Sequence, residues 1–374
     1  MRVLLNTKPL IFKKTGIGYY VTNIRRELLQ AGIDVVPTVD ETAQGLFSSL
    51  SEVSSRMRGM AGRFYPSFVK SLGDLLISSF SVRSSGDRSF DIYHETSVER
   101  MPAVTSGAVA NLYDLLFVHY PVLLPAAIAE TARPDMAANM KRADRVIVNT
   151  QFIGDEAADI LSVPAAKIDV IPLAPSAAYY RSDRAASRER VRRFTEREYV
   201  LCVGTVEPRK NLKTLIRAFR DVVFRDDLSL VIAGGFGWNY DDIVAYAPEL
   251  GIRESVVFTG YLDEETMNDL YNCAAVVVYP SLYEGFGLPP LEAMACGAPL
   301  IISDIPALRE VAGDAAAFFK ASDHEELKQV IETVLSDTAR RASLSEKGLE
   351  RVKLYSWKRT AEETILTYQK VINR

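Results

Sequence analysis

The sequence has little of several features that mark other kinds of protein. Only three cysteines occur in 374 residues, none in a Cys-x-x-Cys pair, which is the usage of a reducing cytosol rather than of a disulfide-linked secreted domain. No run of 18 apolar residues is present, so we expect no transmembrane helix. The formal net charge is −4, which argues against a nucleic-acid partner. We therefore expect a cytoplasmic protein that binds no nucleic acid.

The chain also lacks the usual signatures of a bound metal ion or a nicotinamide cofactor. No Asp-x-Asp tripeptide occurs, and the three histidines, at 94, 119 and 324, lack ligand spacing such as His-Glu-x-x-His. The segment Gly16-Ile-Gly-Tyr-Tyr-Val21 begins like a Gly-x-Gly-x-x-Gly fingerprint but has valine at the third glycine position. It also follows the first predicted strand by about nine residues, too many for the tight turn of that fingerprint. We expect neither cofactor.

Short apolar runs alternate with helical periodicity through most of the chain, which is typical of parallel α/β sheets. A length of 374 residues exceeds what one hydrophobic core usually supports. We therefore predict two doubly wound, Rossmann-like domains that face a cleft, at residues 1–178 and 179–356. A last helix at 357–374 is expected to pack back on the first domain. Ligands of such sheets bind beyond the carboxyl ends of the strands.

The periodicity also predicts individual elements. Strands are expected at 3–6, 33–37, 91–93, 108–113, 145–148 and 168–171 in the first half, and at 199–203, 228–233, 256–258, 275–279 and 300–302 in the second. Helices are expected at 19–31, 134–142, 212–224, 264–273, 290–296, 325–335 and 357–372.

The segment Tyr279-Pro-Ser-Leu-Tyr-Glu-Gly-Phe-Gly-Leu-Pro-Pro-Leu-Glu-Ala-Met-Ala-Cys-Gly297 carries the strongest functional signal. A predicted strand ends here, a glycine-bearing loop follows, and Pro289-Pro290 opens a helix. The loop amides and the positive end of the helix form a candidate anion site. Glu284 and Glu292, on either side of the loop, could face one cleft. Taken alone, they could equally be a solvated loop residue and a residue that favours a helix N-terminus.

A second polar segment, Gly204-Thr-Val-Glu-Pro-Arg-Lys-Asn211, follows a predicted strand and leads into a helix. Arg209 could grip phosphate oxygens with its planar fork, and Lys210 adds a point charge. Fixed cations of this kind can stabilise the charge that develops on a departing phosphate. The alternative is a polar loop capped by Asn211.

The segment from Tyr279 to Gly297 resembles the Glu-x7-Glu signature of retaining glycosyltransferases of family 4, and the similarity extends over nearly the whole chain. The resemblance implies the GT-B fold, with an acceptor-binding first domain and a nucleotide-sugar-binding second domain. It implies that Glu292 holds the donor ribose and that Glu284 lies beside the donor sugar. Arg209 and Lys210 match the family's Arg-Lys-Asn motif and would hold the diphosphate. The other donor-binding residues that it implies are Gly16, Gly18, Gly204, Thr205, Tyr261, Phe286, Gly287 and Leu288.

The glycines at 16 and 18 would let a loop of the first domain bring its amides against the donor. An ordinary flexible loop could have the same composition. Similarly, the turn that contains Tyr261 could contact the nucleotide base or be a plain turn.

One position departs from the family's pattern. Members commonly carry His-Asp at the end of a strand in the first domain, whereas this chain has Tyr113-Asp114. Asp114 stays a candidate catalytic residue. Tyr113 could donate to the donor sugar through its hydroxyl, or His94 could replace the missing histidine, although His94 could equally be structural. The substitution also fits an inactive regulatory relative.

The resemblance therefore implies a retaining, metal-independent hexosyltransferase. The glycine segment is most similar to that of bacterial mannosyltransferases that build surface polysaccharides, so GDP-mannose is the first expected donor, ahead of UDP-glucose or a deoxysugar donor. The acceptor would be a glycan or a lipid-linked saccharide. Two alternatives stay open, a sugar-nucleotide epimerase of the same architecture and a non-catalytic partner subunit.

Residues 46–88 differ in pattern from the rest of the first domain. Large apolar residues recur there at roughly helical spacing, and six basic residues stand against three acidic ones. A cationic amphipathic helix can lie on an anionic membrane, which would suit a lipid-linked acceptor. A helical insertion that packs on its own domain is the alternative.

Overall fold

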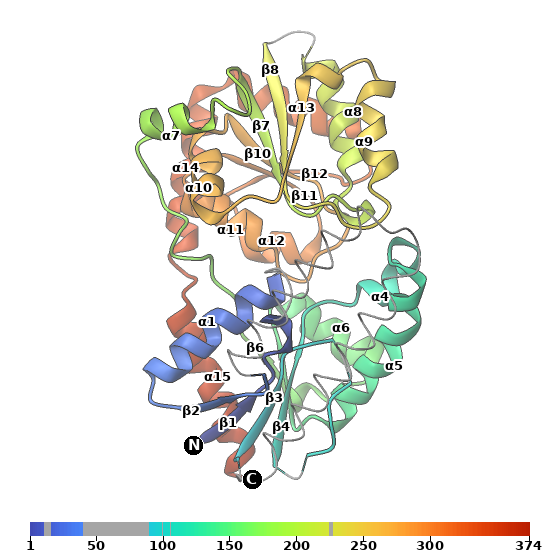
Figure 1. Ribbon diagram of the computed structural model, residues 1–374, viewed down its shortest axis with the longest axis vertical. Helices are drawn as coiled ribbons and strands as arrows, with labels where there is room; N and C mark the ends of the chain where they lie inside the picture. Colours follow the sequence, from blue (N-terminus) through green and yellow to red (C-terminus); the bar gives the residue numbers. More distant parts are fainter. Residues whose placement is uncertain (11–15, 40–89, 99, 105, 224–226) are drawn as a thin grey trace, which may run out of the picture.

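The computed structural model has two α/β lobes arranged along its long axis (Figure 1). It describes all residues except 11–15, 40–89, 99, 105 and 224–226. Each lobe is built on one six-stranded sheet whose paired neighbours are all parallel. This arrangement confirms the predicted α/β class with two Rossmann-like units.

The first sheet has the strand order β2-β1-β3-β4-β5-β6. Alternate residues of β4 and β5 face opposite cores. Val109 and Ile147 lie on the side of α1 and of the C-terminal helix α15 (Trp357–Ile372), and Val146 lies on the side of α5 and α6. Both faces are therefore buried, as parallel sheets require. The strands are β1 (Arg2–Leu5), β2 (Asp34–Pro37), β3 (Ile92–Glu95), β4 (Gly107–Leu112), β5 (Arg145–Val148) and β6 (Ile168–Val170), and the helices are α1 (Gly16–Gln30), α4 (Leu116–His119), α5 (Ala126–Arg142) and α6 (Gln151–Leu161).

The second sheet has the order β12-β11-β10-β7-β8-β9 and is likewise covered on both faces by apolar cores. Its strands are β7 (Glu198–Val203), β8 (Leu228–Ala233), β9 (Val256–Gly260), β10 (Val276–Tyr279), β11 (Leu300–Ser303) and β12 (Ala317–Phe319). Its helices are α7 (Arg184–Val191), α8 (Leu212–Val223), α9 (Asp241–Glu249), α10 (Glu264–Cys273), α11 (Leu288–Ala295), α12 (Pro306–Ala312), α13 (His324–Ser336) and α14 (Thr338–Val352).

The last helix, α15 (Trp357–Ile372), leaves the second lobe and packs on the first sheet (Figure 1). Its hydroxyls are part of this contact, because Thr360 Oγ1 donates to the Pro172 carbonyl at 2.8 Å and the Tyr368 hydroxyl lies 2.7 Å from His94 Nδ1. The Trp357 indole donates to the Pro175 carbonyl at 3.1 Å. The chain therefore crosses between the lobes twice, while the boundary at residue 178 stays a prediction.

Most predicted elements lie within a few residues of their observed bounds, with three informative differences. Helix α5 begins at Ala126, whereas the prediction began it at Pro134. The proline lies inside the helix and does not start it. Helix α1 begins at Gly16, so the predicted glycine loop is in part the first helical turn. The short strand β12 was not predicted, since its three residues are too few to show a periodicity.

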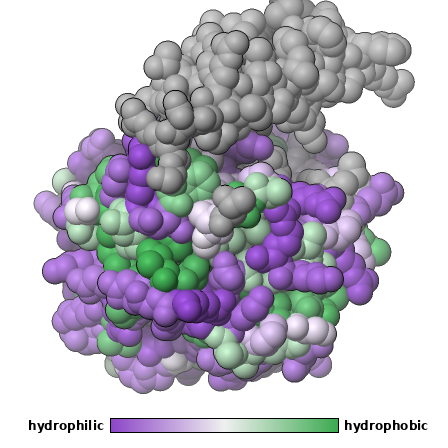
Figure 2. All heavy atoms as spheres, turned by 90° about the horizontal axis from the view of Figure 1, so that it is seen from below, coloured by the Kyte–Doolittle hydropathy of each residue, from purple (hydrophilic) through white to green (hydrophobic). Residues whose placement is uncertain are grey.

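Seen from below, the end of the molecule that carries both termini is mostly hydrophilic, with hydrophobic atoms in separate groups (Figure 2). Exposed large apolar residues include Met1, at the N-terminus, and Ile372, near the C-terminus. Scattered apolar residues of this kind are normal on a protein surface.

We expect Gly234→Ala to lower the free energy of unfolding by roughly 2–4 kcal/mol. Gly234 has φ +152°, and an added Cβ would lie 2.1 Å from the Gly204 carbonyl oxygen in the loop after β7. Urea unfolding of the purified variant measures the loss. The control is Gly235→Ala, since a Cβ there would meet no heavy atom within 4 Å. Equal stability of the two variants would contradict this close approach of backbone.

Candidate active site

The Arg209–Lys210 pair lies where the second sheet ends. After β7, residues 204–207 lead into a 3-10 turn at Pro208–Lys210, and Asn211 follows in the left-handed conformation at φ 54°. The side-chain amide nitrogen of Asn211, Nδ2, donates to the Pro280 carbonyl at 3.0 Å and to the Ala321 carbonyl at 2.7 Å. Asn211 therefore fixes the turn against the loop after β10, and this places both cations beside that loop.

Glu284 is the centre of a buried polar cluster in that loop. Its Oε1 accepts hydrogen bonds from Lys210 Nζ at 2.6 Å and from the Tyr279 hydroxyl at 2.8 Å. Its Oε2 lies 2.8 Å from Arg209 Nη1. Arg209 also pairs with Glu207, at 2.9 Å from Nη2. The structure thus brings three of the four predicted catalytic residues into direct contact.

The charges of this cluster set its protonation states. Burial alone would raise the pKa of Glu284, but Arg209 and Lys210 outweigh it and lower the pKa from 4.5 to about 2. Burial, together with the neighbouring Arg209 charge, lowers the pKa of Lys210. Glu284 is therefore a carboxylate at neutral pH, with a role as a hydrogen-bond acceptor rather than as an acid.

Asp114, the fourth predicted catalytic residue, approaches the cluster from the first lobe. It follows β4, and its Oδ1 accepts a hydrogen bond from the Leu116 amide at 3.0 Å. Burial raises its pKa, an effect that the Arg209 charge opposes. Asp114 is therefore close enough to the cations of the second lobe to feel their charge, although it makes no ion pair with them among the described residues.

The loop that carries Glu284 is pressed against the first lobe. A Cβ on Gly285 would lie 1.7 Å from the Tyr113 carbonyl oxygen, so only glycine fits at this contact. The Thr150 hydroxyl, at the start of α6, donates to the Gly285 carbonyl at 3.0 Å. Nearby, the Glu310 carboxylate of the second lobe accepts from the Gln151 amide at 2.7 Å. The two lobes therefore meet at the predicted site.

Glu292 belongs to a second cluster, at the other end of the loop. It lies in α11, and the Tyr271 hydroxyl donates to its Oε2 at 2.9 Å. Burial raises the pKa of Glu292 from 4.5 to about 7, with a further contribution from the charge of Glu264. Tyr19, in the first turn of α1, has its own pKa raised by burial and then by Glu264, Tyr261 and Glu292. The predicted donor residues Tyr261 and Glu292 thus lie near the glycine segment of the first lobe.

The pKa of Glu292 predicts a pH-dependent gain in stability for Glu292→Gln. Since the folded state raises this pKa above the unfolded value, the carboxyl stabilises the fold below about pH 4.5 and loses that contribution as the pH rises through 7. The amide cannot ionise but can still accept the Tyr271 hydrogen bond. We expect the variant to unfold at higher urea than the parent at pH 8 and at similar urea at pH 4.5. An unchanged difference at the two pH values would contradict this.

The remaining predicted donor residues lie around these two clusters. Gly204 has φ +148°, and a Cβ there would lie 3.3 Å from Lys210 Cε, so the glycine leaves room for the lysine. Thr205 follows it in the same loop. The side chain of Phe286 is buried and contacts the Tyr355 ring at 6.0 Å between centroids, so it packs inside the second lobe.

Helix α11 begins one residue earlier than the prolines that were predicted to open it. Gly287 is its N-cap, in the left-handed conformation at φ 104°, and Leu288 is its first residue. Glu292 therefore lies one residue beyond the first helical turn. Gly18 is buried in α1, whereas Gly16 is exposed at the start of that helix, and a Cβ on Gly16 would meet nothing within 4 Å. No protein atom therefore requires a glycine at position 16, and its expected contact with the donor stays a prediction.

Neither Tyr113 nor His94 takes the place of the missing histidine in this structure. The Tyr113 hydroxyl donates to the Thr96 carbonyl at 2.9 Å, and its carbonyl, not its hydroxyl, contacts the Glu284 loop. His94 is fully buried, with Tyr368 at 2.7 Å from Nδ1 and Asn111 at 2.6 Å from Nε2. Burial lowers the pKa of His94 to about 4. His94 is therefore a neutral structural histidine.

Several residues of the site were not predicted. Glu207 lies in the motif of Arg209 and pairs with it, so its position two residues earlier was an available signal. Tyr271 has no such signal, because only the packing of α10 on α11 brings it to Glu292. The same holds for Glu156 and Tyr283, whose carboxylate and hydroxyl meet across the lobes at 2.6 Å.

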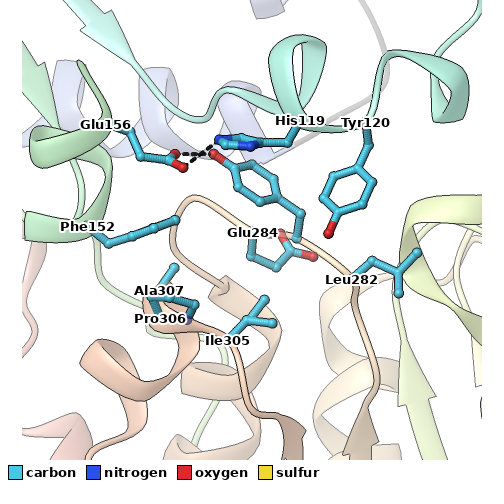
Figure 3. A pocket seen from close by; sticks show the side chains of 10 residues that line it. His119, Tyr120, Phe152, Glu156, Leu282, Glu284, Ile305, Pro306 and Ala307 are labelled. Atoms are coloured by element: carbon cyan, nitrogen blue, oxygen red, sulfur yellow. Dashed lines mark hydrogen bonds and ion pairs between the residues drawn. The ribbon is translucent and has the colours of Figure 1, made fainter. Parts of the chain in front are cut away.

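A cavity of about 170 Å³ lies between the lobes beside Glu284 (Figure 3). The first lobe contributes His119, Tyr120, Phe152 and Glu156, and the second contributes Leu282 to Glu284 and Ile305 to Ala307. The predicted cleft between two doubly wound units is therefore present, with Glu284 in its wall.

Other predictions concern metal ions and membranes. Within the described residues no group of three or more His, Cys, Asp or Glu side chains could hold a metal ion. None of the helices in the described ranges is long and apolar enough to cross a membrane. The predicted membrane-contacting segment, 46–88, lies outside the described residues.

The chain is similar to known proteins in sequence and in fold. Residues 183–351 match the family of glycosyl transferases group 1. O-antigen chain mannosyltransferase B of Escherichia coli is 27% identical over 387 aligned residues, which cover 99% of this chain and 100% of that protein. Serotype-specific mannosyltransferase WbdA of Escherichia coli is 32% identical over 251 residues, 66% of this chain but only 30% of that protein.

The fold has a solved counterpart in sucrose-phosphate synthase of Thermosynechococcus elongatus, with a TM-score of 0.79, 21% identity and coverage of 100% and 99% of the two chains. The fold is therefore the two-domain arrangement of the GT-B type. Its second lobe is a glycosyl transferases group 1 domain, so the resemblance seen in the sequence is confirmed at that level.

Proposed function

We propose that this glycosyltransferase is a retaining, metal-independent mannosyltransferase that uses GDP-mannose. The observation that carries the proposal is the contact of Arg209, Lys210 and Glu284 at the carboxyl edge of the second sheet, with Glu292 at the far end of the same loop. Two cations beside a loop that leads into a helix N-terminus can bind a diphosphate. The carboxylates on either side can accept hydrogen bonds from the hydroxyls of two sugars, the ribose and the transferred hexose. A nucleoside diphosphate sugar has this order of groups.

In the proposed reaction the bond between the sugar C1 and the β-phosphate oxygen breaks, and a bond from C1 to the acceptor hydroxyl oxygen forms on the same face. The hydroxyl proton passes to the departing phosphate, so atoms and charge balance without a protein nucleophile. Arg209 and Lys210 would stabilise the charge on the phosphate in place of a metal ion. In the structure both cations contact carboxylates, so the diphosphate would share them with Glu207 and Glu284.

The names of the two relatives support the choice of donor and acceptor. Both are mannosyltransferases, and one acts on an O-antigen chain. We therefore propose a saccharide acceptor, glycan or lipid-linked, in surface polysaccharide synthesis on the cytoplasmic side of the membrane. Residues 46–88 are the proposed contact with anionic lipid.

The test is release of GDP from GDP-mannose with and without a mannoside acceptor, alongside UDP-glucose and a dTDP-deoxysugar. Acceptor-stimulated release with retention at C1 supports the proposal. Isomerised donor would indicate an epimerase, and tight donor binding without turnover a non-catalytic subunit. Activity that EDTA abolishes and manganese restores would overturn the metal-free mechanism.

We expect Glu292→Ala to weaken GDP binding by roughly 10- to 150-fold at pH 8, where Glu292 is ionised. This is the loss of about 1.5–3 kcal/mol from a hydrogen bond to a charged group. The reason is its place beside Tyr19 and Tyr261, where the ribose of the donor would lie. Isothermal titration calorimetry with GDP measures the effect. The matched control is Glu362→Ala, a glutamate on the exposed side of α15. Parent-like affinity in Glu292→Ala would remove it from the donor site.

A further inference from the structure

The cavity beside Glu284 has the chemistry of a saccharide site. Its aromatic rings surround Tyr283, with centroid distances of 5.2 Å to His119, 6.0 Å to Tyr120 and 6.2 Å to Phe152 (Figure 3). The opposite wall is short and apolar, from Ile305 to Ala307. Pockets that bind small ligands between domains commonly combine such apolar walls with a few placed polar groups. An aromatic face suits the C–H surface of a sugar ring.

The polar groups of the cavity are held in place by one network. The Glu156 carboxylate accepts from the Tyr283 hydroxyl at 2.6 Å and lies 2.5 Å from His119 Nε2. The Leu115 amide donates to the Tyr283 hydroxyl at 3.0 Å. Nε2 of His119 is used in this contact, whereas its Nδ1 makes no hydrogen bond to the described residues. The Tyr120 hydroxyl makes no hydrogen bond within the described part of the chain.

The lining separates this cavity from the proposed donor site. It includes none of Arg209, Lys210 and Glu292 among the described residues, and none of the loop from Phe286 to Leu288. Of the described residues, Glu284 alone belongs to both sites (Figure 3). A ligand in the cavity would therefore lie next to the donor sugar, not on top of it.

We propose that this cavity binds the terminal hexopyranose of the acceptor. The inference rests on the proposed function, because only a transfer reaction has an acceptor. The sugar ring packs on Tyr120, which is partly exposed, and its hydroxyls bond to Tyr120, His119 and Glu284. The buried Tyr283 supports this aromatic wall from behind. Glu284 thereby touches both sugars and aligns the acceptor hydroxyl with C1 of the donor. Because the walls come from both lobes, the acceptor site is complete only when the lobes are together.

The test is binding of methyl α-mannopyranoside in the presence of GDP, measured by saturation-transfer NMR on the full chain. We expect transfer to the sugar in the parent, loss of it in Tyr120→Ala, and roughly 2- to 10-fold weaker binding in Tyr120→Phe, which keeps the ring but removes the hydroxyl. The control is Tyr180→Ala, since that side chain is 58% exposed and outside the cavity. Affinity for GDP, measured on each variant, reports whether the fold is intact.

The outcomes separate this proposal from the proposed function. No transfer to the sugar in the parent, or equal transfer in the parent and Tyr120→Ala, overturns the saccharide site, whatever the donor assay shows. Loss of transfer that is equally large in Tyr180→Ala also overturns it. If the sugar binds as expected but GDP-mannose releases no GDP, the proposed reaction fails and the saccharide site stands.

Discussion

Glu284→Ala should abolish detectable mannosyl transfer and lower the free energy of unfolding by about 3–5 kcal/mol, the usual cost when one partner of a buried ion pair is removed. The variant leaves the Lys210 ammonium buried with only the Tyr279 hydroxyl as a hydrogen-bond partner among the described residues. It leaves Arg209 with Glu207 and the Tyr283 carbonyl. It also removes the one side chain common to the donor site and the cavity. Urea unfolding and the GDP-release assay measure the two effects.

A double variant separates the two causes. Lys210→Met in the background of Glu284→Ala removes the unpaired charge, so part of the lost stability should return. Transfer should stay absent, because both the cation and the carboxylate are missing. Parent-like transfer in Glu284→Ala would show that the cluster is structural only. Parent-like stability would show that its charges reach water in solution.

Gly285→Ala should lower transfer by about 100-fold or more, because an error of about 1 Å in the placement of reacting groups is enough for such a loss. The added methyl would lie 1.7 Å from the Tyr113 carbonyl oxygen and 3.0 Å from Asp114 Cβ. The loop or the first lobe must then move apart, which displaces Glu284 from the cavity. The measurement is turnover at saturating donor, together with the acceptor concentration at half-maximal rate.

The control for this prediction is Gly154→Ala. This glycine is buried in α6, near the same interface, but a Cβ there would have its closest contacts at 3.5 Å, an ordinary packing distance. We expect its turnover to stay near that of the parent. If Gly285→Ala transfers sugar as well as Gly154→Ala does, the close contact between the loop and Tyr113 is not needed for catalysis.

Local chemistry explains which parts of the site could be predicted. Glu284, Arg209 and Lys210 each lie just after a buried strand, and strand ends of a parallel sheet share one edge, so their meeting follows from their order in the chain. Asn211 has a left-handed backbone conformation, and its side chain holds the turn of Arg209 and Lys210 against the loop that carries Glu284. Tyr271, Tyr283 and Glu156 lie on helices and loops whose facing directions depend on how elements pack, and no local pattern records that.

The departures from prediction have the same origin. Tyr113 looked like a replacement for a histidine, but whether its hydroxyl faces the donor depends on the neighbouring strand, and there the Thr96 carbonyl accepts its hydrogen bond. His94 looked like a second candidate, yet α15 returns from the end of the chain and covers it with Tyr368. Contacts between residues this far apart in the chain cannot be read from spacing.

The sequence by itself determined the class of the protein: two parallel sheets, a cationic turn after one strand, a glycine loop with a carboxylate on either side, and the order in which they follow. Periodicity and strand-end position are local properties, so they can be read along the chain. Only the tertiary structure decided that Glu284 is buried yet stays ionised between Arg209 and Lys210. It also decided that Gly285 touches the other lobe and that aromatic residues from both lobes enclose a cavity beside it. Those features depend on burial and on the distance between lobes, which arise only when the chain has folded.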